Sequence, residues 1–156
     1  MMRRASFPRL AAGLVCLVCS LLAGCSLFGP KYAAVRQIQV IAPGDANQTS
    51  ATAVDLVFVY DQAAIAVLPL TGPLWFANQA PLKNVLINRI DVVSIQLQPG
   101  ALVDPVKLPA QYKHALAVYC FVNFIAPAGQ GRADLTLFKQ AVITLGPETV
   151  TYSGTR

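Results

Sequence analysis

The sequence predicts a mainly β protein, an antiparallel sandwich of two sheets with one or two short helical insertions. Two observations carry this prediction. Beyond residue 35, apolar side chains recur at every second position in several short segments, which is the period of a strand with one buried face. Gly, Pro, Asn and Asp separate these segments, and short alternating strands between turns are typical of a β-sandwich.

The first two alternating segments lie between residues 35 and 61. In 35–42, Ile38 and Val40 alternate with glutamines, which predicts a strand with one solvated face. In 53–61, one face carries Val, Leu, Phe and Tyr, and the other carries Asp and Val. Both segments are therefore expected to be strands.

Four further strands are expected after residue 90. Residues 91–98 alternate and end at Pro99–Gly100, where Gly can take a positive φ in a turn. Residues 114–126 are apolar on both faces, as expected of a central strand. The last two segments are expected to form a hairpin around Gly146–Pro147.

The stretch 69–90 departs from strand periodicity. It lacks clean alternation and contains Pro73 and Pro81, which are poorly accommodated inside a sheet. We expect the helical insertions here, around 74–78 and 82–87.

Residues 1–24 have the features of a signal peptide. Arg3, Arg4 and Arg9 precede about 14 apolar or small residues, the length of a signal-peptide apolar core. A helix that spans a bilayer needs roughly 20 such residues. We therefore expect this segment to be cleaved.

The residues before Cys25 resemble the bacterial lipobox, Leu-Ala-Gly-Cys. In that class, diacylglycerol joins the cysteine sulfur, cleavage follows before the cysteine, and an N-acyl chain is added. Two or three chains anchor firmly, since each buried CH₂ contributes about 0.8 kcal/mol. Ser26 follows instead of Asp, so we predict an outer-membrane protein facing the periplasm, with a lipidated tether at 25–34 and one domain at 35–156.

Loss of the signal peptide changes the charge and the cysteine count. Three arginines leave with it, so the formal net charge falls from +5 to +2, which gives no nucleic-acid footprint. Cys16 and Cys19 leave too, and Cys25 carries lipid. Only Cys120 remains, so no internal disulfide is expected.

The sequence offers little for catalysis. His114 is the only histidine, and Cys120 is expected to be a small buried side chain without a partnered base. The carboxylates are scattered, and residues 45–50 lack the glycine of a calcium loop. We therefore expect no enzyme, no metal, no cofactor beyond the lipid on Cys25, and no small-molecule substrate.

Three segments resemble the outer-membrane lipoprotein of type VI secretion systems, the TssJ-like family. They are 38–61 with its Asp45-x-Asn47 loop, 97–124 with its Pro-Gly turn and long apolar strand, and 131–153 after a turn bearing Arg132. The order and spacing of these segments, together with the lipobox, carry the resemblance.

The resemblance implies a transthyretin-like sandwich whose partner is the periplasmic domain of a TssM-like inner-membrane protein. It also implies that the loop 43–52, between the first two strands, contributes to partner contact. Its polar composition suits a wet interface. The predicted contact residues are Asp45, Ala46, Asn47, Gln48, Thr49 and Ser50.

Two other functions remain open at this point. An outer-membrane lipoprotein that serves peptidoglycan or another envelope assembly would share the anchor and the fold, and only its partner would differ. A small periplasmic hydrolase is disfavoured, because no candidate catalytic group has a second group beside it.

Changing Cys25→Ser removes the sulfur that accepts the lipid. We expect the protein to leave the outer membrane and secretion to stop, while the domain stays folded. Membrane fractionation and a secretion assay measure both effects, and secretion retained by the variant would contradict a scaffold role.

Overall fold

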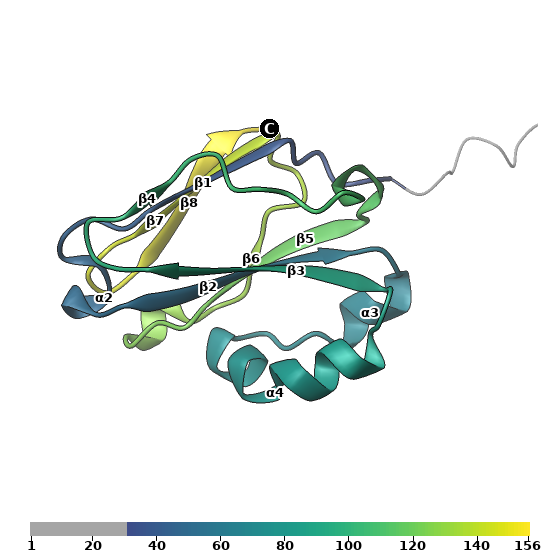
Figure 1. The fold of residues 1–156 in the computed structure, drawn as a ribbon, viewed down its shortest axis with the longest axis horizontal. Coiled ribbons are helices and arrows are strands. Elements are labelled where there is room, and N and C mark those ends of the chain that lie inside the picture. Colours follow the sequence, from purple (N-terminus) through teal and green to yellow (C-terminus); the bar gives the residue numbers. More distant parts are fainter. Residues whose placement is uncertain (1–30) are drawn as a thin grey trace, which may run out of the picture. The chain divides into compact units, whose positions relative to one another are not determined.

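The computed structural model describes residues 31–156, in which Tyr32–Arg156 form one compact unit. Two four-stranded sheets face each other in this unit (Figure 1). Sheet 1 has the order β4 (Leu102–Val103), β1 (Gln37–Ile41), β7 (Gln140–Leu145), β8 (Val150–Thr155). Sheet 2 has the order β3 (Ile90–Leu97), β2 (Thr52–Val59), β5 (Ala117–Val122), β6 (Ala133–Asp134). The predicted mainly β, two-sheet sandwich is confirmed.

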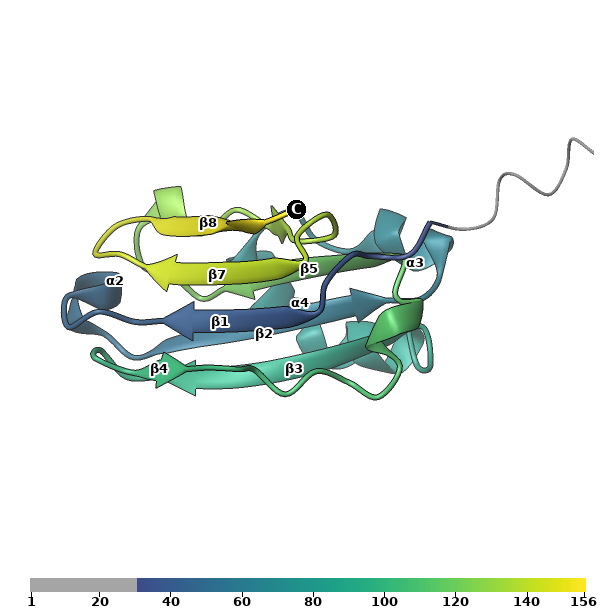
Figure 2. The ribbon, with the colours of Figure 1, turned by 90° about the horizontal axis from the view of Figure 1, so that it is seen from above.

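One strand pair differs from the antiparallel pattern. β1 runs parallel to β7, with Ile38 opposite Ala141, whereas the other strand pairs in both sheets are antiparallel. A parallel pair needs a long crossover connection. Here the whole of sheet 2 lies between β1 and β7 in the sequence and provides it (Figure 2).

The main core lies between the sheets. Ile38 and Val40 of β1 are fully buried and meet Leu56 and Phe58 of β2 in one apolar cluster. The alternation predicted for both segments is therefore confirmed. β5 is buried along its whole length, as expected of a central strand, but it ends at Val122 and does not continue to residue 126.

Two helices cover the face of sheet 2 that points away from sheet 1 (Figure 1). α3 (Gln62–Val67) follows β2, and α4 (Gly72–Val85) is one helix that runs through Pro81. One or two short helical insertions were expected from the sequence, around 74–78 and 82–87, so the single long α4 differs from that expectation and α3 was not anticipated. Pro81 costs a backbone hydrogen bond, but burial of Trp75 and Leu86 against sheet 2 outweighs it.

A buried carboxylate fixes α4 to sheet 2. Asp55 of β2 is 2% exposed, and its Oδ2 accepts a hydrogen bond of 2.7 Å from Trp75 Nε1. The Gln79 side-chain amide donates to the same oxygen. The Trp75 indole also stacks on Phe121 of β5, with ring centroids 4.8 Å apart. At the start of the helix, a Cβ on Gly72 would lie 2.1 Å from the Val122 carbonyl oxygen, so only glycine allows this approach.

Arg132 fixes the segment between α3 and α4. Its guanidinium lies 4.4 Å from the Tyr119 ring centroid and donates to the carbonyls of Leu68 and Pro69 at 3.3 Å. Its backbone N–H donates to the Leu70 carbonyl at 2.9 Å. Arg132 thus satisfies three consecutive carbonyls of this segment, next to the isolated bridge between Thr71 and Gly131.

Changing Trp75→Phe keeps most of the apolar area and removes the indole N–H. We expect the free energy of unfolding to fall by about 1–3 kcal/mol, because the buried Asp55 loses one of its two donors. Denaturant unfolding measures this. The control Asn84→Ala lies on the exposed side of α4 and should change stability by less than about 0.5 kcal/mol; equal effects of the two variants would contradict the proposed anchor.

Candidate functional site

The loop between β1 and β2 contains a left-handed turn. Its residues Ala46–Thr49 form the short element α2, in which Asn47, Gln48 and Thr49 have φ values of 47°, 56° and 62°. Residues other than Gly, Asn and Asp seldom adopt this backbone conformation. Contacts with the rest of the fold must therefore stabilise this left-handed conformation.

The Asn47 side chain supplies that support. It is 1% exposed; its Oδ1 accepts a 2.8 Å hydrogen bond from the Ile125 N–H, and its Nδ2 donates to Thr52 Oγ1 at 2.9 Å. Its backbone N–H donates to the Gly146 carbonyl at 2.8 Å. Asn47 thus joins the β1–β2 loop to the loop after β5 and to the β7–β8 hairpin.

The structure divides the six predicted contact residues. Asp45, Gln48 and Thr49 are exposed and Ser50 is half-buried, whereas Ala46 and Asn47 are each 1% exposed. Buried side chains have almost no surface to offer a partner in this conformation. Partner contact at this loop stays a prediction. The residues predicted to make it are now the exposed ones, and Asn47 stabilises the turn that carries them.

Four segments meet at this end of the sandwich, which we call the loop end: 43–51, 98–101, 123–130 and 146–149. Besides the Asn47 contacts, the Gly100 N–H donates to the Ala42 carbonyl at 2.7 Å. The only charged residues in these segments are Asp45 and Glu148, and both are exposed. The loop end is therefore acidic, without a lysine or arginine.

Ile125 adds an apolar side chain to the loop end that the sequence analysis missed. It is 52% exposed and lies directly beside Asn47. The sequence predicted a strand up to residue 126, which hid the loop. Gln130 Nε2 donates to the carbonyls of Phe124 and Ile125, at 2.9 and 3.2 Å, so side chains replace strand partners beyond Val122.

The described chain enters the sandwich at the opposite end. The Ala33 N–H donates to the Ala115 carbonyl at 2.7 Å, just before β5, and Asn47 meets the residues just after β5. Eight residues of extended chain, from Ala115 to Asn123, span about 26 Å. The loop end thus lies a full strand length from Tyr32. Cys25, the predicted lipidation site, lies outside the described residues.

Cys120 and His114, the two side chains that the sequence analysis weighed for catalysis, lie in different environments. Cys120 is fully buried between the sheets, and burial raises the pKa of its thiol to about 12. Its neighbour Tyr152 also has a raised pKa, mainly because of burial. His114 is exposed in a short turn, with its ring edge-on to Tyr32 at 5.7 Å. A thiol that stays protonated is a poor nucleophile.

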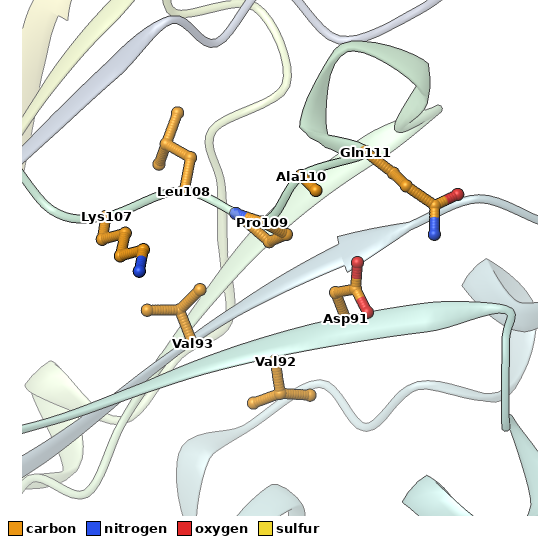
Figure 3. A pocket seen from close by; sticks show the side chains of 8 residues that line it. All are labelled: Asp91, Val92, Val93, Lys107, Leu108, Pro109, Ala110 and Gln111. Carbon is orange, nitrogen blue, oxygen red and sulfur yellow. The ribbon is translucent and has the colours of Figure 1, made fainter.

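An open groove of about 510 Å³ runs between β3 and the segment 107–111 (Figure 3). Asp91 stands on the β3 wall and Lys107 on the other wall. The Asp91 carboxylate accepts a 2.7 Å hydrogen bond from the Tyr60 hydroxyl, and burial together with this carboxylate raises the pKa of Tyr60. The carboxylate is thus already engaged within the fold.

Two features of residues 31–156 bear on membranes and metals. None of the helices there combines the length and the apolarity that a bilayer crossing requires. Within the same residues, His, Cys, Asp and Glu side chains do not gather in groups of three or more that could hold a metal ion.

Solved structures with the same fold come from type VI secretion systems. The T6SS lipoprotein TssJ1 from Pseudomonas aeruginosa matches with a TM-score of 0.57 and 14% sequence identity, over 75% of this chain and 92% of its own. Serratia marcescens Lip, a membrane-bound component of the type VI secretion system, matches at 0.53 and 15% identity, over 77% and 96%. A chain of a type VI membrane complex matches at 0.53 and 18% identity, over 75% and 95%.

These likenesses establish the fold of the protein. No protein-family model and no curated protein sequence matches the chain. The compact unit nevertheless corresponds to nearly the whole length of three type VI secretion proteins. The chain therefore has the fold of the TssJ lipoproteins, which the resemblance in its sequence implied.

Changing Asn47→Ala should destabilise the domain by about 1–3 kcal/mol, because the Ile125 N–H and the Thr52 hydroxyl lose a buried partner. The matched control is Gln48→Ala, whose backbone has the same left-handed conformation and whose side chain is exposed. It should stay within about 0.5 kcal/mol of the parent. Thermal unfolding distinguishes the two variants, and an unchanged Asn47→Ala protein would refute the supporting role.

Proposed function

We propose that this protein is an outer-membrane lipoprotein of a type VI secretion envelope complex, in which it docks the periplasmic part of an inner-membrane protein. The observation that carries the proposal is the fold shared with three type VI secretion proteins over 92–96% of their lengths. The lipobox before Cys25 adds independent support, since two of those proteins are described as a lipoprotein or as membrane-bound.

The geometry supports a connector. The described chain begins at one end of the sandwich, and the loop end lies about 26 Å away along β5. A domain anchored through Cys25 can therefore present the loop end away from its own membrane. The two packed sheets between these ends therefore set the distance from Tyr32 to the loop end.

The loop end suits a protein partner. Asp45, Gln48 and Thr49 offer polar groups around the exposed Ile125, and Asn47 holds them in place through buried hydrogen bonds. An apolar centre within a polar rim is the usual anatomy of a transient interface. Because Asp45 and Glu148 are its only charges, the complementary surface on a TssM-like partner is expected to be neutral or basic.

Changing Ile125→Asp should weaken capture of the partner's periplasmic domain at least tenfold, the order of magnitude expected when an apolar anchor of an interface is lost. The matched control is Val67→Asp, since Val67 is 55% exposed against 52% for Ile125 and lies in α3, outside the loop end. Pull-down from envelopes with the lipidated protein measures capture.

Thermal unfolding should be nearly unchanged in both variants, because both side chains are exposed. Equal capture by the two variants would place the partner elsewhere on the domain. Recovery of peptidoglycan or of an unrelated envelope assembly, without an inner-membrane partner, would overturn the proposed function.

A further inference from the structure

The end of the sandwich at which the described chain begins is built from segments far apart in the sequence. We call it the tether end and define it as 32–36, 86–89, 112–116, 137–139 and 154–156. The Arg36 N–H donates to the Lys139 carbonyl at 2.8 Å, and the Lys139 N–H donates to the Thr155 carbonyl at 2.7 Å. The Ala33 N–H reaches the Ala115 carbonyl at 2.7 Å.

Cations collect at this end. Exposed arginines and lysines project from all five of its segments: Arg36, Arg89, Lys113, Lys139 and Arg156. In residues 31–156 the one ion pair joins Arg89 to Asp61 at 3.4 Å. The other four cations have no carboxylate within ion-pair distance there, and Asp91, close to the Tyr60–Arg89 contact, is engaged by the Tyr60 hydroxyl.

Neutral groups hold two of these cations in place. Arg36 donates to the Val35 carbonyl at 2.8 Å, and the Arg156 guanidinium lies 5.2 Å from the Phe138 ring centroid. Neither contact compensates the positive charge. The tether end therefore keeps its charge, in contrast to the loop end, whose only charges are Asp45 and Glu148.

Apolar side chains stand among the cations. Tyr32, Ile87 and Leu137 are 49%, 70% and 56% exposed. Aliphatic and aromatic tips surrounded by lysine and arginine are typical of protein surfaces that lie in the headgroup region of a bilayer. Tyr32 lies only seven positions after Cys25, the predicted lipidation site, and this short spacing favours a lipid surface over an acidic protein partner.

We propose that the tether end lies against an anionic lipid leaflet, where Arg36, Lys113, Lys139 and Arg156 contact lipid phosphates and Tyr32, Ile87 and Leu137 enter the headgroup layer. This rests on the proposed function in one respect: a lipid on Cys25 would keep the leaflet within about 25 Å of Tyr32. Each cation near an anionic surface strengthens binding about fivefold. The sandwich then stands on the membrane with its loop end outward.

The experiment reads the depth of each end in a bilayer. A fluorescent label is placed at Leu137→Cys or at Ile125→Cys in the purified lipidated protein, since Cys120 is buried and its raised pKa keeps it unreactive. The protein is reconstituted in vesicles of phosphatidylethanolamine and phosphatidylglycerol that contain a lipid-borne quencher. We expect the label at 137 to be quenched several times more strongly than the label at 125.

Charge variants test the electrostatic part. Lys113→Gln with Lys139→Gln should abolish most of the difference between the labels, as should high salt or phosphatidylcholine vesicles. The matched control, Lys83→Gln with Lys107→Gln, changes the net charge equally at exposed positions outside the tether end and should preserve the difference. Equal quenching at both ends, or a difference that ignores lipid charge and both variants, overturns the proposal.

The outcomes separate this inference from the proposed function. Mass spectrometry of the same sample reports the lipid on Cys25. A lipidated chain with both labels in water overturns the inference alone. A chain without lipid that still binds anionic vesicles through its tether-end cations overturns the anchor alone, and one that binds none overturns both. Shielding of the label at 137 without vesicles would indicate a protein partner and would overturn the lipid contact.

Discussion

The hydrogen bonds to Asp55 hold α4 against the outer face of sheet 2, and the rest of the fold depends on this contact. A carboxylate on the middle of a central strand is costly to bury unless donors meet it. Trp75 and Gln79 meet it from α4, and the same indole stacks on Phe121. The face of sheet 2 that points away from sheet 1 is therefore a second core, and β2 and β5 are buried on both faces.

Because β5 is buried on both faces, it forms a firmly packed connection between the two ends of the domain. Its first residues adjoin Ala115, which bonds the entering chain, and its last residues lead to the loop that Asn47 holds. A strand fixed by two cores moves little at either end. The separation of the tether end from the loop end thus follows from packing in the middle of the molecule.

The two ends differ in charge as well as position. Unpaired cations gather around Tyr32, and the loop end carries only Asp45 and Glu148. Residues 31–156 carry a formal net charge of only +2, so this asymmetry is invisible in their net charge. In the proposed arrangement, an anionic leaflet would repel the acidic loop end, and a basic partner surface would be repelled by the cationic tether end.

Much of the fold could be predicted because alternation of apolar residues is a local signal. Ile38 and Val40, or Leu56 and Phe58, mark a buried face without any knowledge of their neighbours. α3 and the continuity of α4 through Pro81 could not be predicted in this way, since both depend on what sheet 2 offers to Ala64, Trp75 and Leu86. Propensity yields to tertiary packing at such positions.

For the candidate site, the sequence by itself determined that a polar loop follows the first strand and that a lipobox precedes the domain. Only the tertiary structure decided which loop residues are exposed and which are buried and stabilise the turn. Asn47 looks like its neighbours in the sequence, but the Ile125 N–H that it accepts lies 78 residues away. Long-range hydrogen bonds of this kind leave no local pattern, because the partner is fixed by the path of the whole chain.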